Sequence, residues 1–176
     1  MFADGRVEQG SELLPSNPAT AQQLDDTWSA DASFALDQVE HDARFAGHIA
    51  EDRVGIFGHS FGGNVAARVP QRDARFTRAA NLDGAFFGES PVVIEKPLLI
   101  LYAASDTGID LSFCRANPAK CNAVAFPAAR HMNFSDAGIL PSRFPLPRAL
   151  LLLGPVDSAG FLREISDRLQ MFFAES

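Results

Sequence analysis

The feature that most constrains this chain is the hexapeptide GHSFGG at residues 58–63, which follows the apolar run VGIF at residues 54–57. A Gly-x-Ser-x-Gly pattern between a strand and a helix is typical of a nucleophile elbow, a strained turn that exposes the serine side chain. Gly58 and Gly62 are expected because close backbone approach leaves no room for a Cβ. We predict a helix over residues 64–69 that ends at Pro70, because proline lacks the N–H. The alternative is a glycine-rich turn without chemistry.

A serine nucleophile needs a base, and a carboxylate that orients the base. The chain has four histidines. His41 and His48 precede the serine, whereas α/β-hydrolases follow the order serine, acid, histidine. His59 lies inside the turn, where we expect its side chain to point away from that of the serine. His131, in a loop after the strand expected at residues 122–126, is therefore the predicted base, and the alternative is an ordinary loop histidine.

Two aspartates compete for the role of the acid. Asp83 follows the strand expected at residues 78–82, and Asp106 follows the strand expected at residues 97–104. Both would lie at the carboxyl end of a parallel strand, where α/β sheets gather catalytic groups. The usual α/β-hydrolase placement favours Asp106, although this residue also suits the capping of a turn at residues 105–108. The residues alone leave the acid open.

Four segments, in this order, carry a family resemblance: GHSFGG at 58–63, NLDGAFF at 81–87, HMNFSD at 131–136 and GPVDS at 154–158. From about residue 52 onward, roughly two thirds of the chain resembles the platelet-activating factor acetylhydrolases of the plasma and bacterial type. The resemblance implies an α/β-hydrolase-type, mostly parallel sheet with flanking helices. Because that family keeps its acid in the Leu-Asp element, it implies Ser60, Asp83 and His131 as the catalytic triad. It also implies short-acyl ester substrates, including acetylated phospholipids, while a related polyester or a small aryl ester is equally open.

The stretch before the serine is short for such a sheet. Only 59 residues precede Ser60, whereas a single βαβ unit takes about 30 residues or more. Residues 1–20 are polar and rich in turn formers, and we expect an irregular segment there. We therefore interpret residues 21–176 as a partial α/β-hydrolase domain that lacks the N-terminal strands.

Residues 21–46 have the pattern of a helix. Apolar residues fall near helical spacing along it, and they are Trp28, Ala32, Ala35, Leu36 and Val39. We expect this helix to pack on the sheet just before the nucleophile strand. Trp28 is then predicted to lie in the core rather than against a ligand.

Missing strands would have two consequences. The strand at residues 54–57 would become a sheet edge with unpaired N–H and C=O groups, which invites a homo-oligomer or a complementing chain. The oxyanion hole would keep the backbone N–H of Phe61, the residue after the nucleophile, but lose the donor that a loop after the third strand supplies. Losing one donor typically costs about 10²–10³ in rate.

Composition excludes several classes of partner. The net charge of −7 argues against nucleic acid and against anionic membrane surfaces. No run reaches the roughly 18 apolar residues of a membrane span. The leucines of residues 149–153 are expected to be a buried helix end rather than a lipid-docking surface. The chain opens without a secretory signal, and its localisation stays unknown.

The remaining candidate sites are weak. Cys114 and Cys121 bracket a turn, so a disulfide is feasible, and two reduced thiols are equally compatible with the spacing, which fits no zinc signature. The sequence Glu40-His41-Asp42 could ligate a metal, but we favour a solvated polar face. No metal and no cofactor are expected.

Together these observations predict a serine carboxylic-ester hydrolase that acts on a small-molecule or lipid ester. The alternative from another class is a non-catalytic hydrolase fragment that acts as a binding or assembly piece. The two differ in whether Ser60 is chemically activated.

Overall fold

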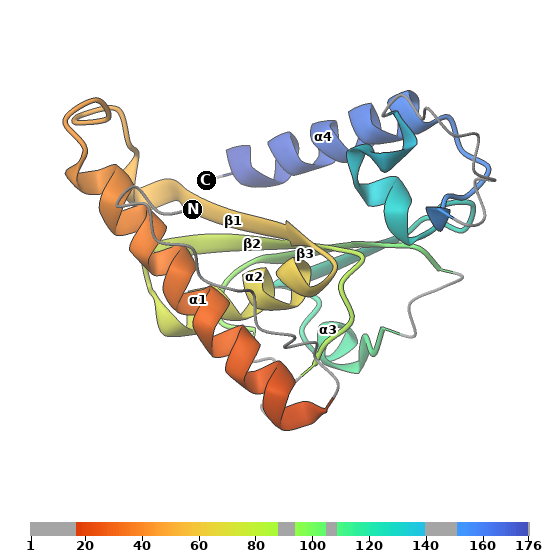
Figure 1. The fold of residues 1–176 in the computed structure, drawn as a ribbon, viewed down its shortest axis with the longest axis horizontal. Coiled ribbons are helices and arrows are strands. Elements are labelled where there is room, and N and C mark those ends of the chain that lie inside the picture. Colours follow the sequence, from red (N-terminus) through yellow and green to blue (C-terminus); the bar gives the residue numbers. More distant parts are fainter. Residues whose placement is uncertain (1–16, 88–93, 105–108, 140–150, 176) are drawn as a thin grey trace, which may run out of the picture.

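A computed structural model describes residues 17–87, 94–104, 109–139 and 151–175, and Figure 1 shows the arrangement. The sheet has four strands in chain order, each parallel to its neighbour: β1 (Val54–His59), β2 (Phe76–Leu82), β3 (Leu98–Tyr102) and β4 (Cys121–Ala125). The helices are α1 (Pro18–His41), α2 (Phe61–Arg72), α3 (Ser112–Ala116) and α4 (Ser158–Ala174). Short 3₁₀ turns cover Glu51–Arg53, His131–Phe134 and Asp136–Gly138. The predicted mostly parallel sheet with flanking helices is confirmed.

The two faces of the sheet are covered by different helices, because side chains alternate along a strand. Leu99 and Leu101 of β3 join Phe161 and Ile165 of α4 in one apolar core. On the other face, Ile100 belongs to a second core, which also includes residues of α2 and α3. Helix α1 lies outside α2, on the flank of the molecule (Figure 1). The outcome is a three-layer α/β arrangement with α1 added to one side.

Strand β1 has a single neighbour, β2, within the described residues. No strand precedes it in that part of the chain, so β1 forms an edge, as the short N-terminal stretch predicts. The Phe57 side chain of this strand is 59% exposed and contacts Phe173 of α4. The partner expected at this edge stays a prediction.

Two helix boundaries differ from the predictions. Helix α1 spans Pro18–His41 rather than residues 21–46, because Asn17 caps its first turn by accepting from the Thr20 N–H at 2.9 Å. Residues 1–16 of the expected irregular segment lie outside the described residues. Helix α2 continues through Pro70 to Arg72. Proline removes one backbone bond there, and the helix ends two residues later.

The prediction that Trp28 lies in the core is wrong, since its side chain is 46% exposed. The buried positions of α1 are Ala21, Asp25 and Ser29. Helix α1 packs mainly against α2, and two of its three buried residues are polar, while Ala32 and Leu36 pack on the apolar cluster of Val65, Val69 and Phe76. Arg72 of α2 donates hydrogen bonds to Asp25 and Ser29, so the spacing of apolar residues alone could not identify these buried positions.

The two cysteines form a disulfide, Cys114–Cys121, which joins α3 to the start of β4. Of the leucine run, residues 149–150 lie outside the described residues, while Leu153 is buried and Leu152 is half exposed. Among the helices in the described ranges, none combines the length and apolar character that crossing a membrane requires.

Candidate active site

Ser60 occupies the turn between β1 and α2. Its backbone has φ 59° and ψ −128°, and it is the residue that caps α2. A positive φ is an outlier for a residue with a Cβ, and such strain at a strand-to-helix turn is the geometry of a nucleophile elbow. The Ser60 N–H donates to the Leu82 carbonyl of β2 at 2.9 Å, which fixes the turn against the sheet.

The expected role of the two elbow glycines is half right. A Cβ on Gly58 would collide with the backbone of Gly62, which confirms the need for glycine at residue 58. A Cβ on Gly62 would meet nothing within 4 Å, so the prediction for residue 62 is wrong. The crowding falls instead on Gly63, beside the Asn81 amide, and on Gly84, whose Cβ would collide with the Ser60 carbonyl oxygen. The tight approach thus joins the serine turn to the loop after β2.

The structure brings together the three residues predicted as a triad. The Nε2 atom of His131 lies 3.0 Å from Ser60 Oγ, and its Nδ1 atom lies 2.8 Å from Asp83 Oδ2. The Nδ1–H therefore donates to the carboxylate, and Nε2 is left to accept from the serine hydroxyl. A neutral imidazole in this tautomer is arranged to take the serine proton.

Asp83 is fixed from several sides. It has φ 53° and a fully buried side chain, whose Oδ1 accepts from the Ala103 N–H at 2.7 Å. The Asn81 amide makes two hydrogen bonds to the backbone of Gly84, at 2.7 and 2.9 Å, and so closes the turn around the aspartate. No local sequence pattern marks Asn81 for this role. The competing Asp106 lies outside the described residues.

The loop that carries His131 is held by Asn133. Its buried Oδ1 accepts from the Arg130 N–H at 2.8 Å and from the Gly154 N–H at 2.7 Å. The Met132 N–H also donates to the Leu152 carbonyl at 3.1 Å. These bonds join the histidine loop to the segment before α4. Asn133 and Gly154 both fall in segments that carry the family resemblance, so the sequence did single out these two segments.

His59 contacts the candidate base rather than the nucleophile. The two imidazole rings lie 4.5 Å apart between centroids, and His59 Nε2–H donates to the His131 carbonyl at 3.0 Å. Burial lowers the pKa of the His59 imidazole, although the hydrogen bond to the His131 backbone opposes this shift. A neutral His59 therefore supports the His131 loop without adding a charge beside it. Sequence analysis set this residue aside.

Phe61 opens α2, so its N–H belongs to the first turn, where backbone donors have no partner within the helix. The Gly63 and Asn64 N–H groups both point to the Ser60 carbonyl, at 2.9 and 3.3 Å. Within the described residues the Phe61 N–H has no hydrogen-bond partner, and it lies at the positive end of the helix dipole.

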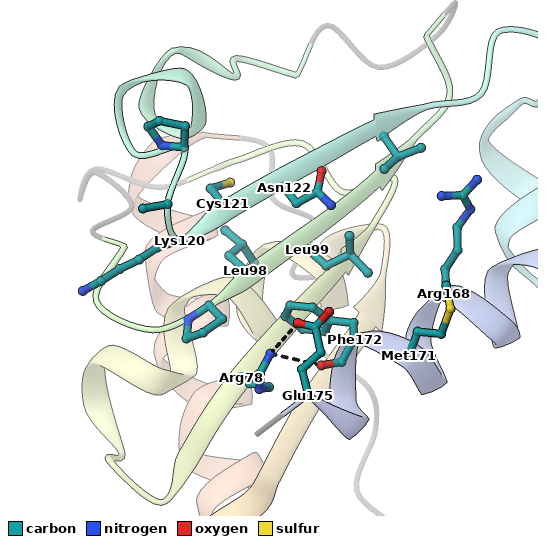
Figure 2. A pocket seen from close by; sticks show the side chains of 14 residues that line it. Arg78, Leu98, Leu99, Lys120, Cys121, Asn122, Arg168, Met171, Phe172 and Glu175 are labelled. Atoms are coloured by element: carbon teal, nitrogen blue, oxygen red, sulfur yellow. Dashed lines mark hydrogen bonds and ion pairs between the residues drawn. The ribbon is translucent and has the colours of Figure 1, made fainter.

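A cavity of about 360 Å³ lies elsewhere, between the sheet and α4 (Figure 2). Its lining includes Leu98 and Cys121, the first residues of β3 and β4, so it opens at the amino ends of the strands. Figure 2 shows Arg78 directed toward Glu175 at 3.3 Å and toward the Phe172 carbonyl at 3.1 Å. The candidate triad gathers at the opposite ends of the strands, so this cavity is not part of it.

The two carboxylates of the candidate metal site at residues 40–42 are bonded to arginine side chains. Glu40 Oε2 accepts from Arg75 at 2.7 Å, and Asp42 accepts from Arg44. Within the described ranges, no three His, Cys, Asp or Glu side chains gather in a way that would hold a metal ion.

No protein-family model matches this chain. A protein of Arthroderma benhamiae, named as a probable 1-alkyl-2-acetylglycerophosphocholine esterase, is 30% identical over 89 residues, which are 51% of this chain and 21% of that protein. The solved structure of a ferulic acid esterase from Streptomyces cinnamoneus matches with a TM-score of 0.74 and 27% identity, over 98% of this chain and 54% of the other. A dienelactone hydrolase structure from Klebsiella pneumoniae matches with a TM-score of 0.57 and 22% identity, over 86% and 62% of the two chains.

The sheet, its helices and these structural likenesses define a protein with the α/β-hydrolase fold. The fungal relative and the Streptomyces protein are both named as esterases. The chain spans about a fifth of the fungal protein and about half of the Streptomyces chain.

Proposed function

We propose that this protein is a serine carboxylic-ester hydrolase. The observation that carries the proposal is the continuous pair of hydrogen bonds from Ser60 to His131 and from His131 to Asp83. The same geometry in other hydrolases serves nucleophilic attack on an acyl carbon. The positive φ of Ser60 and the free first-turn N–H of α2 agree with that use.

In the proposed reaction, Ser60 Oγ attacks the ester carbonyl carbon while His131 Nε2 takes the serine proton. The Phe61 N–H stabilises the oxyanion of the tetrahedral intermediate. The carbon–oxygen bond to the alcohol then breaks, and the alcohol leaves with the proton from His131. Water attacks the acyl-serine with His131 as base again, which releases the acid and restores Ser60. Asp83 holds the imidazole in its tautomer and stabilises its cation.

For the substrate we propose short-acyl esters, including acetylated phospholipids. This rests on the resemblance to platelet-activating factor acetylhydrolases and on the printed name of the fungal relative. The chemistry as written needs no cofactor, because the triad supplies the nucleophile and both proton transfers.

A fluorophosphonate probe tests the proposed activity, because it labels only an activated serine. We expect labelling of the folded protein that disappears in Ser60→Ala. The matched control is Ser112→Ala, an exposed serine on α3, which should leave labelling intact. A folded but unlabelled wild-type protein contradicts the proposal.

The acid assignment has its own contrast. Asp83→Asn should lower kcat by up to about 10⁴, because the imidazole loses the carboxylate that sets its tautomer. Asp106→Asn should cost far less. Steady-state hydrolysis of a p-nitrophenyl ester measures both variants, and the reverse ranking would assign the role to Asp106.

A second candidate function is a non-catalytic binding or assembly piece. It is favoured by the edge position of β1, which exposes a row of backbone groups to a partner chain. An unlabelled protein that forms oligomers by light scattering supports this candidate. A labelled monomer with brisk, Ser60-dependent turnover contradicts it.

A further inference from the structure

Three aromatic side chains from separate parts of the chain meet beside the candidate nucleophile. Trp28 of α1 lies edge-to-face against Phe61, with ring centroids 5.2 Å apart and an interplanar angle of 86°. Phe87, in the segment after β2, lies on Phe61 as well, at 6.0 Å and 34°. We call Trp28, Phe61 and Phe87 the aromatic surface.

The aromatic surface is open to solvent at both flanks. Trp28 is 46% exposed and Phe87 is 39% exposed. Large apolar side chains that stay exposed together in a folded protein mark a place where a ligand or partner binds. The central ring belongs to Phe61, whose own N–H stands beside Ser60. Because Phe61 directly follows Ser60 in the chain, we expect a group attached to the attacked carbonyl to come within reach of these rings.

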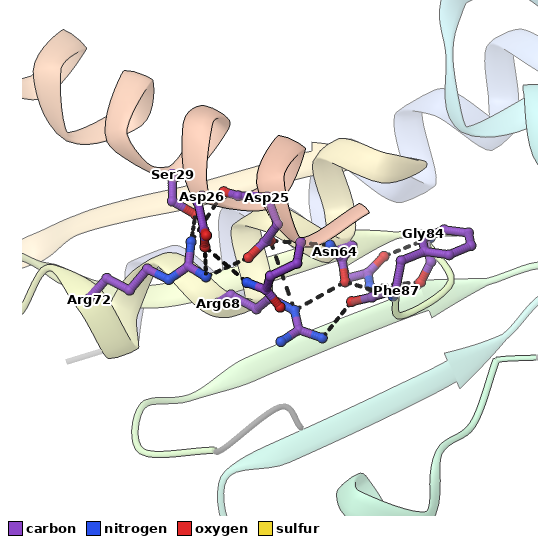
Figure 3. A network of polar contacts seen from close by, with 10 residues as sticks. Asp25, Asp26, Ser29, Asn64, Arg68, Arg72, Gly84 and Phe87 are labelled. Atoms are coloured by element: carbon purple, nitrogen blue, oxygen red, sulfur yellow. Dashed lines mark hydrogen bonds and ion pairs between the residues drawn. The ribbon is translucent and has the colours of Figure 1, made fainter. Parts of the chain in front are cut away.

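A buried polar network holds the two flanks of the aromatic surface in place (Figure 3). On the α1 side, Asp25 accepts from Arg72 at 2.6 Å and from the Asn64 amide at 3.2 Å. Asp25 is 1% exposed and lies one turn before Trp28 on the same helix. The helix that carries Trp28 is thus fixed to α2 by a carboxylate that has left water.

The same network reaches Phe87. The Phe87 N–H donates to Asn64 Oδ1 at 3.1 Å, and the Phe87 carbonyl accepts from Arg68 at 2.8 Å (Figure 3). Asn64 is fully buried, and Arg68 is 4% exposed. Both side chains come from α2, directly after the serine turn. The backbone segments that carry Trp28 and Phe87 are therefore both fixed to α2, which reduces the entropy lost when a ligand binds.

We propose that the aromatic surface binds a planar aromatic ring on the alcohol side of the ester. This inference rests on the proposed function, because short acyl groups leave only the alcohol side to carry a ring. Edge-to-face and offset contacts with aromatic neighbours favour an aromatic ring over a saturated ring of equal size. The expected preference is about 2- to 10-fold.

The test compares benzyl acetate with cyclohexylmethyl acetate, two esters of similar size whose leaving groups are both alkoxides. We expect a higher kcat/KM for benzyl acetate by about 2- to 10-fold, and we expect Trp28→Leu to bring the ratio close to one. The matched control is Phe34→Leu, because Phe34 is a 62% exposed aromatic residue on the same helix. This control should keep the wild-type ratio.

A binding measurement separates this inference from the proposed function. Trp28 is the single tryptophan of the chain, so tryptophan fluorescence reports on the aromatic surface alone. In the Ser60→Ala protein, benzyl acetate should give a saturable change at a lower concentration than cyclohexylmethyl acetate. Absence of hydrolysis with a saturable signal would reject the proposed function only. Equal rates and equal binding for the two esters would overturn the inference.

Discussion

Helices α1 and α4 are attached to the rest of the molecule by opposite means. Helix α4 buries Phe161 and Ile165 in an apolar core that includes Phe134 and the strands. Helix α1 buries Asp25 and Ser29 against the charged side chain of Arg72, and only the partly buried Ala32 and Leu36 add apolar contacts. The first attachment depends on area removed from water and tolerates small shifts, whereas the second depends on hydrogen-bond geometry and fixes one position.

The difference has an energetic side. Burial raises the pKa of the Asp25 carboxyl, although Arg72 and Arg68 lower it. Forming the charged network therefore has a desolvation cost that the apolar attachment of α4 lacks. Such a network adds little net stability, but it fixes the position of the helix. That position matters at α1, because this helix carries Trp28, which contacts Phe61, the residue after the candidate nucleophile.

The largest effect is expected at the charged attachment. Asp25→Ala should lower the free energy of unfolding by about 3–5 kcal/mol, because two guanidinium groups lose their buried carboxylate. Urea unfolding measures the change. Asp31→Ala, an exposed position on the same helix, is the control and should stay within about 0.5 kcal/mol. A loss below about 1 kcal/mol for Asp25→Ala would mean that α1 is held by its apolar contacts instead.

The apolar attachment should respond more gently. Ile165→Val removes one methylene from a side chain that is 3% exposed, and should cost about 0.5–1.5 kcal/mol by the same measurement. Met171→Leu, at a position of α4 that is 64% exposed, should leave stability nearly unchanged. Equal and large costs at Asp25 and Ile165 would erase the contrast between the helices.

The smallest effect concerns pH. Arg75 joins Asp37 of α1 to Asp73, at 2.6 Å each, and its hydrogen bonds lower the pKa of Asp73 from 3.8 to about 2. Because the folded pKa is the lower one, the stabilisation is complete above pH 3.8 and is lost as the pH falls through 3.8 toward 2.

Arg75→Met should therefore flatten the loss of stability across that acid range, measured as the thermal midpoint against pH. The effect is small because the Arg75 side chain is 34% exposed and solvent screens the pair. Arg163→Met, an exposed position of α4 with the same change of charge, is the control. Parallel acid profiles for wild type and Arg75→Met would contradict the assignment.

Local sequence pattern was sufficient for the sheet, since each of the four expected strands agrees with an observed strand to within two residues at either end. Pattern failed for α1, because the partners of Asp25 lie on another helix. Arg72 is 47 positions away in the chain, and an aspartate at a helical interior position is ordinarily solvated.

The candidate site shows the same division. The elbow motif predicted Ser60 and the order of the histidines predicted His131, whereas Asp83 was predicted only from the family resemblance. The residues that hold them in place, Asn81, Asn133 and His59, were missed, since their hydrogen bonds go to backbone groups of other loops. The error at Gly62 arose likewise, because the contact that forbids a Cβ depends on how two loops approach.

The strand order has a consequence for how the site comes into being. Strands pair in the order in which they occur, so the sheet can grow from one edge by short closures. The bond between Ser60 and His131, by contrast, joins positions 71 apart and spans the whole sheet from β1 to the loop after β4. Trp28 and Phe61 meet within the first part of the chain. During refolding, tryptophan fluorescence should therefore reach its final value before Ser60 becomes reactive. The appearance of that reactivity then indicates that the last strand has docked.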